Sequence, residues 1–119
     1  MVYYNGFVIA VPTANKTAYV DFVRTVWPHM KKLGATRLVE AWGDNVPDGK
    51  LTDMKRAVQA KADETVVFSW IEWPDKATAE KADEAMRNDP AMAEMSKAMP
   101  FDGSRMIFGF FTSIFDSAR

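Results

Sequence analysis

The segment ETVVFSWIEW, residues 64–73, decides the predicted fold. It is rich in β-branched and aromatic residues, which favour a strand. Successive side chains of a strand point to opposite faces, and here both faces are apolar: Val66, Phe68 and Trp70 lie on one, and Val67, Ile71 and Trp73 on the other. An antiparallel strand with one wet face would alternate apolar and polar residues instead. We therefore expect this strand to be covered on both faces.

Three other segments, residues 3–11, 36–43 and 105–115, are also predicted to be strands. The first and the last repeat the two-faced pattern. Phe7, Ile9 and Val11 oppose Val8 and Ala10 in the first, and Met106, Phe108 and Phe110 oppose Ile107, Gly109 and Phe111 in the last. A further short strand is predicted at residues 54–60, MKRAVQA, as part of a hairpin through the KADE turn.

The first predicted helix begins after Asn15, a suitable N-cap, and ends before Gly34, which suits the residue just past a helix end. Its apolar residues recur at helical spacing: Tyr19, Phe22, Val23, Val26, Trp27, Met30 and Leu33. Pro28 removes one backbone hydrogen bond, which predicts a kink near Arg24.

The second predicted helix begins at Pro74-Asp75 and ends at Asn88-Asp89-Pro90. A short helix follows, with Met92, Met95 and Met99 on one side, more typical of adaptable core than of a ligand stripe. The element order is β-α-β-β-α-β, which predicts one ferredoxin-like α+β domain with an antiparallel sheet over residues 1–119.

The two-faced strands also predict an assembly. A monomer would expose a large apolar sheet face, which soluble monomers seldom do. A second copy packed sheet to sheet is the simplest cover, and a homodimer is the prediction. The alternative is that loops of the same chain cover this face.

Composition narrows the class of protein. Hydrophobic residues make up 48% of the 119 residues, no apolar run is long enough to span a membrane, and the start lacks the features of a signal peptide. The absence of cysteine excludes disulfides and fits a reducing cytoplasm. A net charge of −1 offers no broad field for nucleic acid, and the third strand carries two glutamates where RNA-recognition domains carry basic residues. We expect a cytoplasmic protein that binds neither nucleic acid nor membrane.

The stretch WGDNVPDGKLT, residues 42–52, resembles a phosphate or calcium loop only superficially. Five residues separate Gly43 and Gly49 where the phosphate loop needs four, and Leu51 stands where it needs a hydroxyl. The calcium template would place Lys55 at its final carboxylate position. The stretch is predicted to be a turn that overhangs a pocket mouth.

Two mirrored triplets, EAW at 40–42 and WIE at 70–72, supply the candidate site. If the two strands pair so that Glu40 opposes Glu72 and Trp42 opposes Trp70, each carboxylate lies beside an indole and near a like charge. That environment raises a pKa, as a general acid or base requires. Glu40 and Glu72 are the predicted catalytic residues. The alternative is that both lie at a wet sheet edge.

The remaining predicted contacts to a substrate come from Trp42 and Trp70, with Arg37 or Arg56 as counter-charges. His29 is the only histidine and is predicted to lie at the surface, since no partner for catalysis or metal binding accompanies it. No metal or cofactor is expected.

Four segments, NGFVIAVP, EAWGDNVPDGK, VVFSWIEWP and MPFDGSRMIFGFF, occur in an order and spacing that resemble an uncharacterised bacterial family catalogued as domain of unknown function 1428. The resemblance covers nearly the whole chain and implies a subunit of the dimeric α+β barrel group. That group is functionally mixed: it includes cofactor-independent monooxygenases, haem-degrading enzymes, chlorite-processing enzymes and ligand-binding regulators. The resemblance supplies no set of catalytic residues, and Phe110 stands where a second glycine is expected.

Two functions remain open. The first is a small enzyme, oxygenase-like or isomerase-like and free of cofactor, that acts on an apolar or aromatic molecule in a pocket between sheet and helices. The second is a homodimer that binds or senses a small molecule without converting it. A protein whose only role is dimerisation is the third and plainest interpretation.

Overall fold

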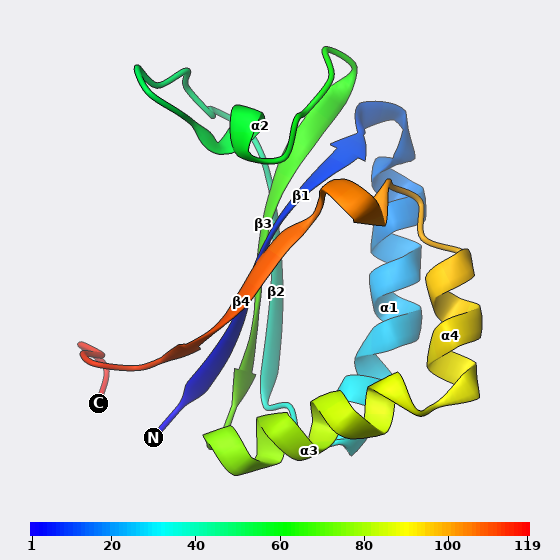
Figure 1. Cartoon of the computed structure of the whole chain (residues 1–119), viewed down its shortest axis with the longest axis vertical. Coiled ribbons are helices and arrows are strands. Elements are labelled where there is room, and N and C mark those ends of the chain that lie inside the picture. The colour runs from blue at the N-terminus through cyan, green and yellow to red at the C-terminus, as the bar shows by residue number, and fades with distance from the viewer.

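The computed structural model describes residues 1–119, and its main elements follow the predicted order (Figure 1). The four strands are β1 (Tyr3–Pro12), β2 (Arg37–Trp42), β3 (Glu64–Trp73) and β4 (Ile107–Thr112). Their order in the sheet is β2-β3-β1-β4, and every neighbouring pair is antiparallel. This is the predicted ferredoxin-like α+β fold.

The helices gather on one side of the sheet. The long helices are α1 (Lys16–Lys32), α3 (Lys76–Arg87) and α4 (Pro90–Lys97). Two short 3₁₀ turns connect helices to strands: Thr13–Asn15 lies between β1 and α1, and Gly103–Arg105 lies between α4 and β4. Figure 1 shows α1 and α4 side by side against one face, with α3 across its lower end. No long helix lies on the opposite face, which is called the open face below; the helix side is called the covered face.

Local chemistry sets the helix ends at the predicted places. Gly34 has φ +111°, a conformation that a residue with a side chain rarely adopts, just past the end of α1. The Asp75 carboxylate accepts a 2.8 Å hydrogen bond from the Thr78 amide at the start of α3. Asp89 caps α4 in the same way, and Pro90 is its first residue.

One local prediction is wrong, and a second holds for the position of the residue but not for its hydrogen bond. Residues 54–60 form no strand: Met54–Ala57 is the short helix α2, because the Asp53 side chain caps it by accepting from the Arg56 amide. Asn15 stands at the N-cap position of α1, but its side chain makes no capping bond and instead donates to the Pro100 carbonyl (3.0 Å).

The covered face holds most of the core. Trp73 is 1% exposed, and its indole nitrogen donates to the Asn5 side chain (3.0 Å). Ala79 and Ala82 of α3 are buried against the same cluster. Small side chains at these positions bring α3 close to the sheet.

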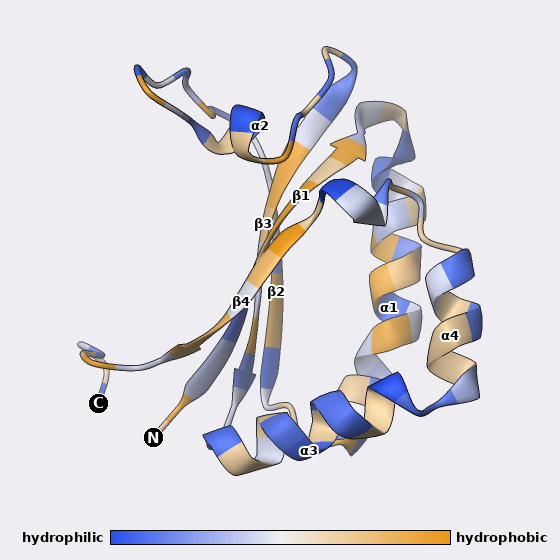
Figure 2. Cartoon of the chain, in the orientation of Figure 1, coloured by the Kyte–Doolittle hydropathy of each residue, from blue (hydrophilic) through white to orange (hydrophobic).

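The open face is apolar and largely uncovered. Phe68, Ile107 and Phe111 are 47%, 44% and 58% exposed. Figure 2 shows hydrophobic residues along the middle of β1, β3 and β4. The prediction of two-faced apolar strands is therefore confirmed in the chain.

The chain covers one end of the open face itself. The segment between β2 and β3 brings Val58 against Ala10 and Val66, and these three residues are buried together. Val46 packs beside them. The alternative that loops cover this face thus holds at that end only.

Candidate functional site

The pairing of β2 with β3 separates the two predicted catalytic carboxylates. Glu40 lies opposite Ser69, and Arg37 lies opposite Glu72. The predicted register differs from this one by an odd number of residues, and such a shift exchanges the faces of a strand. Glu40 therefore belongs to the covered face and Glu72 to the open face, so the prediction that they share one site is wrong.

A cavity of about 210 Å³ lies between the covered face, α1 and α4. Most of its wall is apolar, and methionines and aromatic rings form a large part of it. The methionines are Met30, Met92, Met95, Met99 and Met106, and the rings are those of Phe7, Tyr19, Phe22 and Phe101. The polar exceptions include Glu40 and Ser69. An apolar cavity with a few polar groups is the usual form of a small-molecule site.

Glu40 and Tyr19 form the polar end of this cavity. The Tyr19 hydroxyl donates a 2.6 Å hydrogen bond to the Glu40 carboxylate. Burial raises the pKa of Glu40, although hydrogen bonds from Tyr19 and Ser69 oppose the shift. Burial, together with the neighbouring carboxylate, raises the pKa of Tyr19 well above its usual range. At neutral pH Tyr19 is therefore the proton donor of the pair.

Glu40 also reaches the outside of the protein. It belongs to β2, which is an edge strand of the sheet, and it lines a second, outer depression beside Arg24 and Arg37. Neither arginine forms an ion pair with Glu40. A carboxylate between a cavity and the surface can exchange protons with water while it faces a bound molecule.

Trp42 shares the covered face with Glu40 but does not line the cavity. Its ring packs beside the buried cluster that includes Ile9 and Val67. The Lys16 ammonium lies 5.5 Å from the ring centroid, within range of a cation–π interaction.

Three predicted residues meet on the open face instead. The Trp70 indole nitrogen donates to Glu72 (3.0 Å), and the Arg37 guanidinium lies 3.3 Å from the same carboxylate oxygen. The guanidinium carbon of Arg37 is 6.0 Å from the Trp70 ring centroid. These side chains form a polar cluster at one end of an otherwise apolar face.

Arg56 and the predicted turn lie away from the cavity. Arg56 contacts the Asp53 carboxylate at 2.9 Å and donates to the carbonyl groups of Leu51 and Gly49. It therefore stabilises the loop between β2 and β3, which Figure 1 shows on the open side. That loop is irregular, but it does not overhang the cavity. His29 is exposed near the end of α1, as predicted.

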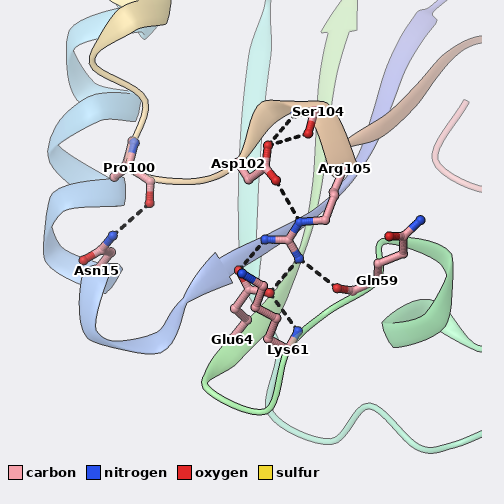
Figure 3. A network of polar contacts seen from close by, with 8 residues as sticks. All are labelled: Asn15, Gln59, Lys61, Glu64, Pro100, Asp102, Ser104 and Arg105. Atoms are coloured by element: carbon pink, nitrogen blue, oxygen red, sulfur yellow. Dashed lines mark hydrogen bonds and ion pairs between the residues drawn. The ribbon is translucent and has the colours of Figure 1, made fainter.

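A network of polar contacts around Arg105 lies beside the cavity wall (Figure 3). Its guanidinium donates two hydrogen bonds, of 2.7 and 2.6 Å, to the two oxygens of Glu64 and a third, of 3.0 Å, to Asp102. The hydrogen bonds from Arg105 lower the pKa of Glu64 to about 2. This pairing fixes the 3₁₀ turn between Phe101 and Met106, two residues of the cavity wall.

The sequence interpretation missed the partners of Glu40. The helical spacing places Tyr19 only on the apolar stripe of the first helix, yet a buried tyrosine hydroxyl needs a hydrogen-bond partner. That requirement was the available signal. Ser69 gave no comparable signal, because its position opposite Glu40 depends on the register. No group of three or more histidine, cysteine, aspartate or glutamate side chains is arranged to hold a metal ion.

The fold and the site define the chain as a ferredoxin-like α+β protein with an apolar cavity under its helices. Residues 2–103 match the family described as a protein of unknown function (DUF1428), and the chain belongs to this family. The uncharacterised protein YbaA of Escherichia coli K12 is 50% identical over 116 residues, which cover 98% of this chain and 99% of the relative. The uncharacterised YbaA of Shigella flexneri matches equally well.

Solved structures agree on the fold. A dimeric ferredoxin-like protein from an uncultured marine organism has a TM-score of 0.67 at 13% identity, covering 100% of both chains. SnoaB, a cofactor-independent oxygenase from Streptomyces nogalater, has a TM-score of 0.59 at 10% identity, covering 99% of this chain and 97% of its own. At these identities the likeness concerns the fold alone. No helix of the chain is long and apolar enough to cross a membrane.

Proposed function

We propose that this protein is a small enzyme that transfers a proton to or from an apolar or aromatic molecule held in the cavity, with Glu40 as the base. The observation that carries the proposal is the Glu40 carboxyl at the end of an apolar cavity, bonded to Tyr19 and paired with no cation. Burial raises its pKa towards neutrality, where a general base works best.

Tyr19 has a supporting role in this proposal. Its 2.6 Å hydrogen bond fixes one carboxylate oxygen and leaves the rest of the group to face a ligand. When Glu40 takes up a proton, the Tyr19 hydroxyl stays in place as a neutral neighbour, because its own pKa is raised. The pair thus stays hydrogen-bonded in both protonation states of Glu40.

Proton removal is the first step of both reaction types that we consider. In an isomerase-like reaction the proton returns to another atom of the same molecule. In an oxygenase-like reaction the carbanion reacts with molecular oxygen, and no cofactor is part of the proposal. The fold shared with SnoaB, a cofactor-independent oxygenase, is compatible with the second type.

The proposal is tested with 5-nitrobenzisoxazole, a small carbon acid in which a nitrobenzene ring is fused to an isoxazole ring. A base removes its ring proton, the nitrogen–oxygen bond breaks, and the coloured 2-cyano-4-nitrophenolate appears. We expect wild-type protein to catalyse this reaction, with a rate that rises as Glu40 loses its proton. Glu40→Gln should lower the rate at least about 100-fold, the usual contribution of a general base.

Two further variants make the test specific. Glu80→Gln changes an exposed carboxylate of α3 and should leave the rate unchanged. Glu72→Gln tests the other predicted catalytic residue, on the open face. A rate no greater than that of free acetate, or a loss with Glu72→Gln in place of Glu40→Gln, would overturn the proposal.

The proposed assembly is a homodimer in which the open faces of two copies of the chain pack against each other. The exposed Phe68, Ile107 and Phe111 support it, because such a patch is rarely left in water. The dimeric ferredoxin-like relatives in structure support it too. The Arg37–Glu72 pair would lie towards one end of that interface.

The alternative function, binding or sensing without conversion, is favoured by one feature. β1 and β3 contribute to the cavity on one side and to the open face on the other. A ligand that moves these strands would also move the dimer surface. Ligand binding that changes dimer affinity, with no proton transfer, would favour this alternative.

A further inference from the structure

The cavity has a size and a charge pattern that restrict what it accepts. Its volume of about 210 Å³ is below the 300–1,000 Å³ typical of sites for drug-sized molecules. A cavity of about 150 Å³ accepts benzene. The cavity therefore suits a molecule with one ring and a small substituent.

The lining also excludes anions. Among its residues, only Glu40 and Tyr19 are ionisable, and no lysine, arginine or histidine is present. A carboxylate or phosphate would enter without a counter-charge and beside a group that is itself acidic, which is unfavourable in an apolar site. Negatively charged ligands are thus disfavoured both by the lack of a cation in the lining and by the nearby Glu40 carboxyl.

The polar end of the cavity favours a ligand that donates a hydrogen bond. The Glu40 carboxylate has about four acceptor positions, and the hydrogen bond from Tyr19 uses one of them. The Tyr19 hydroxyl gives its hydrogen to Glu40 and so offers only its oxygen to a ligand. An uncharged hydroxyl on the ligand fits both groups.

The apolar wall favours a ring over a chain of the same size. Phe7, Phe22 and Phe101 present aromatic surface, and the methionines supply polarisable sulfur that packs well against ring edges. Methionine side chains also repack readily, so the wall can adapt to substituents on one ring.

We infer that the ligand of this cavity is an uncharged single-ring phenol or a similar cyclic alcohol, whose hydroxyl donates to Glu40 while the ring contacts the methionines. This inference rests on the proposed function only in using the same cavity. It narrows the substrate class to neutral one-ring molecules with one donor.

The test uses p-cresol, toluene and 4-methylbenzoate, three probes that share a methyl-substituted ring. Binding is followed by NMR of the methionine methyl groups in the full chain. Five of the eight methionines line the cavity, whereas Met1 and Met54 lie outside it and serve as internal controls. We expect p-cresol to shift the cavity signals, to bind at least about tenfold tighter than toluene, and to outcompete 4-methylbenzoate.

Two variants locate the recognition. Glu40→Gln keeps the size but loses the charged acceptor, so the preference for p-cresol over toluene should fall severalfold while toluene binding stays the same. Glu80→Gln should change nothing. Equal affinity for toluene and p-cresol, or binding of 4-methylbenzoate that is stronger than that of p-cresol, would overturn the inference.

This outcome is separable from that of the enzyme proposal. If p-cresol binds as expected but 5-nitrobenzisoxazole is not converted, the ligand class stands and the proposed catalysis fails. If the carbon acid is converted but toluene and p-cresol bind alike, catalysis stands and the ligand inference fails.

Discussion

The covered and open faces of the sheet are built from alternate residues of the same strands, yet they differ in what completes them. On the covered face, α1, α3 and α4 close over Trp73 and its neighbours and leave a cavity beside Glu40. On the open face, only the segment after β2 covers one end, and aromatic side chains remain in water. The covered face thus holds the main core and the candidate site of one chain, and the open face is the surface proposed to bind a second copy.

The largest expected effect breaks the covered face. Trp73→Ala removes a side chain that is 1% exposed and leaves the buried Asn5 side chain without its donor. We expect the free energy of unfolding to fall by about 3–5 kcal/mol, as for other large-to-small changes in a core. Urea denaturation followed by circular dichroism measures this loss. A loss below about 1 kcal/mol would mean that the covered face is not the main core.

The second prediction breaks the open face. Phe68→Asp places a charge within the proposed interface, where it would be buried without a partner. We expect the dimer dissociation constant, measured by sedimentation equilibrium, to rise at least about 30-fold.

Val20→Asp is the matched control for this change. Val20 is 41% exposed and Phe68 is 47% exposed, but Val20 lies on α1, away from the open face. It should leave the dissociation constant unchanged. Equal effects of the two substitutions, or a wild-type protein that is monomeric at micromolar concentration, would contradict the proposed dimer.

The third prediction concerns the Arg105–Glu64 pair, which holds the 3₁₀ turn between two residues of the cavity wall. Glu64→Gln removes the charge that Arg105 contacts through two hydrogen bonds. We expect a loss of about 1–3 kcal/mol in the free energy of unfolding at neutral pH.

The contribution of the Arg105–Glu64 pair to stability should also be lost at low pH. Because the folded-state pKa of Glu64 is lowered from 4.5 to about 2, its stabilising contribution is complete above pH 4.5 and is lost as the pH falls towards 2. The variant should lack this part of the acid sensitivity. Parallel pH profiles for wild type and variant, measured by thermal unfolding, would contradict the role assigned to the pair.

The smallest expected effect is that of Glu40→Gln, which tests a polar residue within the otherwise apolar covered face. Burial raises the pKa of Glu40, so the folded chain holds this proton more tightly than the unfolded chain, and stability falls as the pH rises through the ordinary pKa towards the raised one. Glu40→Gln removes that cost. We expect the variant to be at least as stable as wild type at neutral pH, within about 1 kcal/mol, and flatter in its pH profile. A variant that is markedly less stable would indicate a structural role for the carboxylate.

The sequence predicts those parts of the fold that depend on local chemistry. Strands follow from alternating patterns, and helix ends follow from Gly34 and Asp75, whose effects act within a few residues. The register of β2 against β3 is different, because about twenty residues join them and no tight turn fixes the pairing. An odd shift in that register moved Glu72 from the predicted site to the other face.

The candidate site was predictable in part for the same reason. Glu40 was singled out because of its place beside a tryptophan in a strand. Tyr19 lies 21 residues before Glu40 in the sequence, and Ser69 lies 29 residues after it. Only the folded chain brings the three residues together. The sequence pattern does not predict the four-residue helix α2, because the Asp53 cap stabilises this helix and no periodic pattern of apolar residues marks it.

The back-to-back use of β3 has a consequence for how the family can diverge. Neighbouring residues of this strand lie on opposite faces: Trp70 lies on the open face, and Ile71 packs in the core of the covered face. Substitution at one position leaves the other free, but the deletion of a single residue would turn Trp73 outward and bring Glu72 into the core. We therefore expect relatives to exchange residues of β3 only for others that suit the same face, while keeping the length of the strand. Insertions are expected in the loop at residues 43–53, which is not part of a strand.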